Sequence, residues 1–486
     1  MIQKYILAID QSTSGTKAIL FDNNGKLIAR SDLPHKQKIF EQGWVSHNPM
    51  EIFENTLAVV KNVVDKAKID KCEIAGAGIS NQRETAMIWN RKTGLPIEDA
   101  IVWQCGRAAE ICNRIKDKAE IVRRKTGLNL SPYFSAGKIS WLLENNKSIE
   151  RADVCAGTMD SWLVYKLTNG KSFKTDFSNA SRTQLMNLES LKWDEEICSL
   201  FNINSKMLAE ICDSNSNFGE TDFGGYLEKE IPIHAVLGDS HAALFGQGCL
   251  KAGMTKATYG TGSSVMMNIG DRPVFSENGI VSSLAWGMDG KVTYVLEGNI
   301  NYTGSVIKWL VDDMKMLASS REAGDIAKTA NSEDCTYLIP AFSGLGAPYW
   351  RSDVKATICG ITRNTGRAEI VKAAEECIAY QIADIVKLMC EESEIKLSEL
   401  RVDGGPTRDD FLMQFQSDIL QMKLSVPQNE ELSGIGAAYA AGIAVKMYDK
   451  EIFDKMQRVS FSPKMSAVKS NEKYAGWKEA VNQLIN

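Results

Sequence analysis

The stretch ILAIDQSTSGTKAILF, residues 6–21, decides the fold. An apolar run ends at Asp10, a turn of small hydroxyl residues and glycine follows, and a second apolar run covers residues 18–21. Two apolar runs around a short turn predict a pair of buried strands. Small side chains at such a turn let backbone N–H groups and hydroxyls close around an anion. The stretch therefore predicts a phosphate site, with an ordinary hairpin rich in Ser, Thr and Gly as the alternative.

The same pattern returns in the second half of the chain. Residues 254–269 form two apolar runs around the turn YGTGSS, and a third glycine turn, VDGGP, occupies residues 402–406 before a predicted helix. No Gly-x-x-x-x-Gly-Lys-Ser/Thr sequence is present, so these turns, and not a P-loop, would cradle a nucleotide's phosphates. The repeated strand–turn–strand unit predicts two related domains, residues 1–246 and 247–486, which face each other across a cleft.

Composition indicates an ordinary globular protein. The chain has 486 residues, of which 44% are hydrophobic and 24% charged, and its length predicts at least two domains. A net charge of −5 argues against a nucleic-acid surface. Eleven cysteines without a Cys-x-x-Cys pair indicate reduced thiols in a cytosol. No segment approaches the roughly 18 apolar residues of a membrane span. We therefore expect a cytoplasmic protein without a nucleic-acid or membrane partner.

Local patterns place the expected elements. Asn48 followed by Pro49 is typical of a helix start, and the apolar periodicity continues to about residue 68. The segment Glu297-Gly298-Asn299 is expected to open a helix that reaches Leu310. Other helices are expected at 107–124, 136–144, 159–166, 367–391, 407–421 and 432–447, and other strands at 74–80, 233–237 and 400–402. Because strands and helices alternate in both halves, the sequence predicts an α/β fold.

Several motifs carry a resemblance to a known family. They are AIDQ at 8–11, GWVSHNPME at 43–51, NQRET at 81–85, AIVWQC at 100–105 and GLGAPYW at 344–350. With them, the sequence resembles the FGGY carbohydrate kinases along nearly its whole length, and within that family it is most similar to the glycerol kinases. The resemblance implies two actin-like ATPase (ribonuclease H-like) domains around a central cleft. It also implies an ATP-dependent kinase that transfers the γ-phosphate to a hydroxyl of a small polyol or sugar, with Mg²⁺.

The resemblance assigns the catalytic and metal-binding roles to two aspartates. Asp239 ends an apolar strand and precedes a helix, and by similarity it is the general base that takes the proton from the acceptor hydroxyl. A helix-capping role is its alternative. Asp10 and Asp239 are the expected Mg²⁺ ligands, and Asp10 is otherwise a turn-capping carboxylate.

The resemblance assigns nucleotide binding to the three glycine turns and one helix. Lys17 stands where glycerol kinases often carry arginine, and a solvated hairpin lysine is its alternative reading. Asp409 replaces a common asparagine, which keeps an acceptor but removes donors to the purine. Glu375 stands where an apolar residue is usual. The expected nucleotide-binding residues are Ser12, Thr13, Ser14, Lys17, Thr261, Gly262, Gly304, Ile307, Gly404, Gly405 and Asp409.

The acceptor residues match in part. Arg83 and Glu84 suit vicinal hydroxyls, because one side chain donates and the other accepts; a surface ion pair is the alternative. Ser264 replaces an aromatic residue, and Ser240-His241 replaces paired glutamines. His241 would bind an extra hydroxyl or simply start a helix. The full set expected to bind the acceptor is Arg83, Glu84, Trp103, Tyr133, Asp239, Ser240, His241 and Ser264.

Losing an aromatic wall opens the acceptor pocket and makes it more polar, so we expect an acceptor larger than glycerol, such as a tetritol, pentitol or ketopentose. A xylulose-kinase-like enzyme and a non-kinase actin-like ATPase are the alternatives. Acidic Glu228 and Glu230 lie in the loop that corresponds to the fructose bisphosphate site of regulated glycerol kinases, so we expect no such inhibition. The oligomeric state is left open between a homodimer and a homotetramer.

Overall fold

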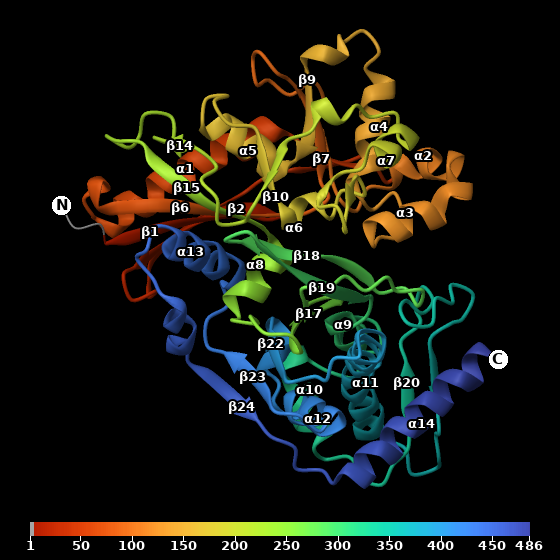
Figure 1. Cartoon of the computed structure of the whole chain (residues 1–486). Helices are drawn as coiled ribbons and strands as arrows, with labels where there is room; N and C mark the ends of the chain where they lie inside the picture. Colours follow the sequence, from red (N-terminus) through yellow and green to blue (C-terminus); the bar gives the residue numbers. More distant parts are fainter. Residues whose placement is uncertain (1–3) are drawn as a thin grey trace.

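A computed structural model describes residues 4–486, so the first three residues of the predicted N-terminal domain lie outside it. The chain forms two α/β domains, with the N-terminal half above and the C-terminal half below in Figure 1. Each domain is built around its own mixed β-sheet. The predicted α/β fold with two domains around a cleft is confirmed.

The N-terminal sheet grows from the opening hairpin. Its strands are β1 (Tyr5–Gln11), β2 (Gly15–Asp22), β3 (Leu27–Pro34), β6 (Ile74–Asn81), β14 (Glu220–Thr221) and β15 (Ile231–Gly238), in the order β14-β15-β6-β1-β2-β3. The first three strands are antiparallel, and β6 lies parallel to both β1 and β15. Helix α1 (Pro49–Ala67) begins at the predicted N-cap, Asn48, whose side chain accepts from the N–H of Met50, and packs on β2 and β3.

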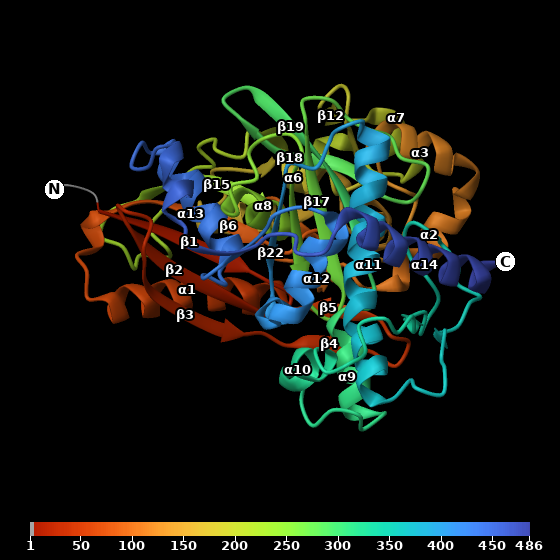
Figure 2. The same ribbon diagram turned by 90° about the horizontal axis from the view of Figure 1, so that it is seen from below.

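The C-terminal sheet repeats this plan. Strand β16 pairs antiparallel with β17 and parallel with β22, as β1 does with β2 and β6. The long helix α11 and its neighbour α12 cover this sheet, as Figure 2 shows. The sheet strands are β16 (Met254–Tyr259), β17 (Ser263–Gly270), β18 (Val281–Met288), β19 (Lys291–Ile300), β22 (Glu399–Asp403), β23 (Leu424–Pro427) and β24 (Arg458–Phe461). The helices are α9 (Gly304–Asp312), α10 (Ala323–Ala327), α11 (Arg367–Ser393), α12 (Asp410–Leu420) and α14 (Ala467–Ile485).

A smaller five-stranded sheet, which the sequence did not predict, extends the N-terminal domain. Its strands are β4 (Gln37–Ile39), β5 (Val45–His47), β7 (Ala86–Asn90), β8 (Ala100–Ile101) and β9 (Val154–Thr158), with α4 (Ser135–Asn145) and α5 (Met159–Leu167) beside it. The remaining elements are short: α2 (Ala109–Arg114), α3 (Ala119–Thr126), α6 (Phe177–Ala180), α7 (Glu195–Leu200), β10 (Lys174–Asp176), β11 (Met186–Asn187), β12 (Lys192–Trp193), β13 (Glu210–Cys212), β20 (Tyr337–Ile339) and β21 (Thr357–Cys359).

Two expected helices were wrong in their bounds. The helix expected at 107–124 is broken at Ile115, which leaves helical geometry (φ −116°, ψ 21°) and packs on the apolar cluster beside the five-stranded sheet. The helix expected from Gly298 begins only at Gly304, because pairing with β17 keeps the backbone in strand β19 as far as Ile300.

Helix α13 (Leu432–Ala444) belongs to the C-terminal half but lies against β1, β6 and β15 of the N-terminal sheet (Figure 1). It also packs on α8 (Asp239–Gly246) with backbone in direct contact. A methyl group added at Gly436 would lie 1.8 Å from the carbonyl oxygen of Ala242, and one added at Gly78 would lie 2.3 Å from that of Ala437. The small residues of β6 and α13 therefore permit the halves to meet closely.

Within residues 4–486, none of the helices carries an apolar run that would reach across a lipid bilayer.

Candidate active site

The two predicted carboxylates lie at the same edge of the N-terminal sheet. Asp10 is near the end of β1, beside Ser80 of β6, and Asp239 directly follows β15, whose Gly238 pairs with Asn81 of β6. The Ser80 hydroxyl donates to Asp10 Oδ1 at 3.1 Å. Burial raises the pKa of Asp10 to about 6; the Lys17 ammonium opposes this shift and the Asp239 charge adds to it. The sheet thus brings both carboxylates to one side of the cleft.

The first glycine turn lies next to this pair. Ser12 closes the turn, because its N–H and its hydroxyl both donate to the Gly15 carbonyl, at 2.9 and 3.0 Å. The Thr13 hydroxyl accepts from Trp103 Nε1 at 2.9 Å, which joins the turn to an expected acceptor residue. Lys17 Nζ is 2.8 Å from Glu431 Oε2 and 3.9 Å from Asp10 Oδ2. The lysine is therefore tied to two carboxylates and is not a solvated hairpin residue.

Arg83 connects the two domains at the candidate catalytic aspartate. Its Nη1 and Nη2 donate to the two carboxylate oxygens of Glu297, on β19 of the C-terminal domain, at 2.8 and 3.0 Å. Its Nε is 3.2 Å from Asp239 Oδ1. This buried guanidinium therefore fixes the position of the Asp239 side chain relative to β19.

Glu297 and Arg182 are site residues that sequence reasoning did not assign. Arg182 Nε donates to Glu84 Oε1 at 2.6 Å, and its Nη1 is 3.0 Å from Glu297 Oε2. Burial alone would raise the pKa of Glu297, but the Arg182 and Arg83 guanidinium groups hold it well below its usual value. The sequence did contain a signal for Glu297, because this acidic residue ends an apolar run, as Asp10 does.

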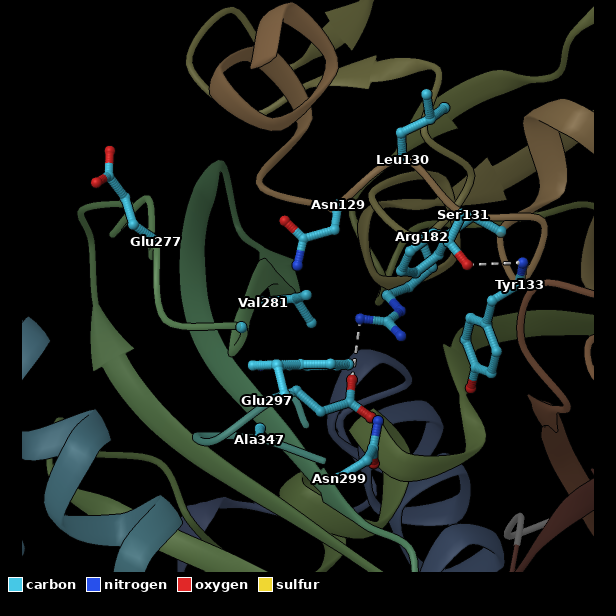
Figure 3. Close-up of a pocket in the computed structure, with 13 residues that line it drawn as sticks. Asn129, Leu130, Ser131, Tyr133, Arg182, Glu277, Val281, Glu297, Asn299 and Ala347 are labelled. Atoms are coloured by element: carbon cyan, nitrogen blue, oxygen red, sulfur yellow. Dashed lines mark hydrogen bonds and ion pairs between the residues drawn. The ribbon is translucent and has the colours of Figure 1, made fainter. Parts of the chain in front are cut away.

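A cavity of about 660 Å³ opens beside this network, between the domains. Figure 3 shows Arg182 between Tyr133 and Glu297 on its wall. The Trp103 and Tyr133 rings meet edge to face, with centroids 5.6 Å apart. Two buried donors, Arg83 Nε and Arg182 Nη1, have no aligned acceptor anywhere in residues 4–486. The lining residues are Asn129, Leu130, Ser131, Tyr133, Phe134, Arg182, Glu277, Gly279, Val281, Glu297, Asn299, Ala347 and Trp350.

Three expected acceptor residues depart from the family pattern, and their surroundings differ: Ser240, His241 and Ser264. Ser240 Oγ accepts from Arg83 Nη2 at 3.3 Å, and Ser264 Oγ donates to Glu297 Oε1 at 3.4 Å. Both serines therefore contact the network around the candidate base. His241 is fully buried, contacts Ser283 Oγ at 3.2 Å and does not line the interdomain cavity.

A second cavity, of about 610 Å³, lies within the C-terminal domain. Four of the expected nucleotide-binding residues line it: Gly304, Ile307, Gly405 and Asp409. Thr261, Gly262 and Gly404 are not among its lining residues, although Gly404 directly precedes Gly405. The Thr261 carbonyl accepts from the Thr303 N–H, at 2.9 Å, just before α9.

Gly404 brings the third turn against the second hairpin. Its φ is 102°, and an added methyl would lie 1.9 Å from the Tyr259 carbonyl oxygen. Gly262 has the same role at the hairpin tip, where a methyl would lie 2.3 Å from the Ile300 carbonyl. Only glycine permits these approaches, so the glycine pattern of the sequence reflects close backbone packing around the cavity.

Comparison with known proteins identifies the class. Residues 5–246 match the N-terminal domain of the FGGY family of carbohydrate kinases, and residues 255–445 match its C-terminal domain. The chain is 46% identical to glycerol kinase 1 of Thermotoga maritima over 490 residues, which cover 99% of each protein. The crystal structure of Plasmodium falciparum glycerol kinase with ADP matches with a TM-score of 0.94 and 37% identity, over 99% of this chain and 98% of that one.

The chain therefore belongs to the FGGY family of carbohydrate kinases. It is an ATP-dependent carbohydrate or polyol kinase, and its similarity to glycerol kinases does not favour an actin-like ATPase without kinase activity. A ligand-bound xylulose kinase from Lactobacillus acidophilus shares the fold, with a TM-score of 0.89 over 99% of this chain and 98% of that one, but only 21% identity.

Proposed function

We propose that the protein transfers the γ-phosphate of ATP to a hydroxyl of a linear polyol with four or five carbons. The proposed size of the acceptor is based on one observation, the cavity of about 660 Å³ beside Tyr133, Arg182 and Glu297. Ser264 lies beside this cavity, because its hydroxyl is 3.4 Å from Glu297 Oε1 on the cavity wall, and a bulky aromatic side chain at this position would take up more of the space around Glu297.

The polar lining supports an acceptor with more than three hydroxyls. Arg83 Nε and Arg182 Nη1 lie 3.2 and 3.0 Å from the carboxylates of Asp239 and Glu297, but neither N–H is aligned with them, so both donors suit a hydroxyl oxygen of the acceptor. The side chain of Asn299, further along the same wall, offers both a donor and an acceptor. The 46% identity to a glycerol kinase, against 21% to a xylulose kinase, favours a polyol over a ketopentose.

The proposed reaction is an in-line transfer. Asp239, held by Arg83, takes the proton of the acceptor hydroxyl as that oxygen bonds to the γ-phosphorus. The bond from the γ-phosphorus to the bridging oxygen of ADP breaks, and that oxygen keeps the electron pair. The turn at Ser12–Gly15 and the hairpin tip at Thr261–Gly262 would orient the phosphates.

Mg²⁺ enters as part of the nucleotide substrate. Such an ion keeps several waters and is held by one or two carboxylates together with the phosphates. Asp10 and Asp239 fit this role, since both are carboxylates at one sheet edge. When bound, the ion would neutralise phosphate charge.

The test is an ADP-release assay across glycerol, tetritols, pentitols, hexitols and ketopentoses, with MgATP. We expect the highest kcat/KM for a tetritol or pentitol. Glycerol with clearly the highest value would overturn the proposed acceptor size. A ketopentose with the highest value would overturn the polyol assignment.

Two substitutions at position 264 test whether this residue determines the size of the acceptor. Ser264→Phe should shift the ratio of kcat/KM values toward glycerol by about tenfold or more, since differences of a few carbon atoms in a pocket change specificity by that order. Ser264→Ala removes only the hydroxyl and should keep the parental order of acceptors. An unchanged order in both variants would contradict the role of position 264.

A further inference from the structure

Glu375 is a buried acidic residue without a structural partner. It lies on α11, its side chain is 3% exposed, and it lines the C-terminal cavity together with Ile378. Its Oε2 has no hydrogen-bond partner among the residues that the structure describes. Its neighbour Glu376 is equally buried but is bonded to Lys473 at 3.2 Å and to the Tyr380 hydroxyl at 3.4 Å. Position 375 therefore carries a polar group that folding alone does not use.

The protonation state of this carboxyl follows from its surroundings. Burial raises the pKa of Glu375 well above its usual value, and the nearby Asp409 charge adds to the effect. The side chain therefore keeps its proton to a higher pH than an exposed glutamate does, and in that state it has one O–H donor and one acceptor oxygen. The charged side chains that line the cavity with Glu375 are Arg321, Arg408 and Asp409. On α11 itself, the neighbouring titratable groups are Lys372, Glu376 and the Cys377 thiol, whose pKa is raised by burial and by the Glu375 charge.

The rest of the cavity suits a flat ring. Ile307, Ile378 and Leu412 supply apolar walls. Asp409 Oδ1 accepts from the backbone N–H groups of Phe411 and Leu412, at 2.8 and 3.2 Å, so this carboxylate is held in place at the start of α12. A carboxylate only accepts hydrogen bonds, whereas a neutral carboxyl also donates. The cavity thus holds one fixed acceptor and one buried carboxyl without a partner, which is a donor when it is protonated.

We propose that Glu375 is a specificity-determining residue for the nucleotide base, whose carboxyl donates to a ring nitrogen of adenine while Asp409 accepts from the adjacent amino group. Adenine presents such an amine beside a ring nitrogen, whereas guanine has a carbonyl oxygen in place of the amine. That oxygen would face the Asp409 carboxylate, so guanine is disfavoured. The inference rests on the proposed nucleotide site and names the group that reads the base.

Two substitutions separate base recognition from a structural role. Glu375→Leu removes the donor, and we expect the KM for ATP to rise about tenfold or more while kcat changes less than twofold. The ratio of kcat/KM for ATP over GTP should fall by a similar factor. Glu375→Gln keeps a donor and an acceptor, so its KM and ATP preference should stay within about threefold of the parent. Glu376→Gln, the matched control, should leave base preference unchanged.

The pH dependence gives a second readout. Deprotonation of Glu375 at alkaline pH would remove the donor and place a charge beside Asp409. The parental KM for ATP should therefore rise with increasing pH, and the Glu375→Gln variant should lack this rise. A parental profile that Glu375→Gln reproduces would overturn the assignment.

Direct titration with ADP and GDP, without an acceptor, keeps this test independent of the proposed reaction. If the protein phosphorylates no polyol but Glu375→Leu loses its preference for ADP over GDP, the inference stands and the proposed acceptor fails. If Glu375→Leu binds both nucleotides as the parent does, and thermal unfolding shows that it is folded, the inference is wrong.

Discussion

The interdomain cavity and the C-terminal cavity differ in whether the buried charged side chains beside them have ionic partners. Beside the interdomain cavity, Glu297 pairs with both Arg83 and Arg182, and Arg182 also pairs with Glu84. Each of these four side chains therefore has an ionic partner within about 3 Å. In the C-terminal cavity, Glu375 is buried without such a partner. The difference indicates separate roles: the Arg83–Glu297 pair joins the two domains beside the proposed acceptor site, whereas the unpaired Glu375 carboxyl remains available to a ligand.

The largest expected effect tests the centre of the paired network. Asp239→Asn keeps the size of the side chain but removes the proposed base, so kcat should fall by roughly 100- to 10,000-fold. Affinity for ADP, measured by titration, should stay near that of the parent, because the second cavity is untouched. A variant that phosphorylates its acceptor as fast as the parent would refute the assignment.

Breaking the network from the other domain should cost stability as well as activity. Glu297→Gln removes the buried negative charge that Arg83 and Arg182 share, and we expect a loss of about 3 to 5 kcal/mol in the free energy of unfolding. Urea unfolding measures it. The exposed pair of Arg123 with Glu120 supplies the control, since Glu120→Gln should cost no more than about 1 kcal/mol. Equal effects of the two substitutions would contradict the proposed difference between buried and surface pairs.

Substitution of the unpaired Glu375 should change the free energy of unfolding in the opposite direction. Glu375→Leu removes a buried polar group that lacks a partner, so the free energy of unfolding should increase by about 1 to 3 kcal/mol. Glu376→Leu, one residue along the same helix, breaks the contacts with Lys473 and Tyr380 and should destabilise the protein. Thermal unfolding of both variants compares them directly, and destabilisation by both would mean that Glu375 stabilises the fold.

The smallest expected effect concerns a surface loop that contributes to neither of these two cavities. The loop at residues 223–230 carries Glu228 and Glu230, and Glu230 is 3.2 Å from Lys171. Because acidic groups repel a bisphosphate, millimolar fructose bisphosphate should change the initial rate by less than about twofold. Strong inhibition in the standard assay would refute this expectation.

Sequence patterns predicted those parts of the molecule that depend on local order. The two hairpins, the N-cap at Asn48 and the carboxylates at strand ends all follow from short stretches, and the glycine turns lie where expected. The Arg83–Glu297 and Arg182–Glu84 pairs could not be found in this way, because their members are 214 and 98 residues apart. Glu297 was also placed at a helix start, since its stretch does not reveal that pairing with β17 continues the strand.

The backbone contact between α8 and α13 has a mechanical consequence. These helices cannot slide past each other, because even a methyl group at Gly436 would overlap the Ala242 carbonyl. The C-terminal half is therefore joined to α8 through the backbone itself. Asp239 sits on the first turn of α8, so this contact, together with the ion pair to Arg83, ties the proposed proton acceptor to the opposite domain.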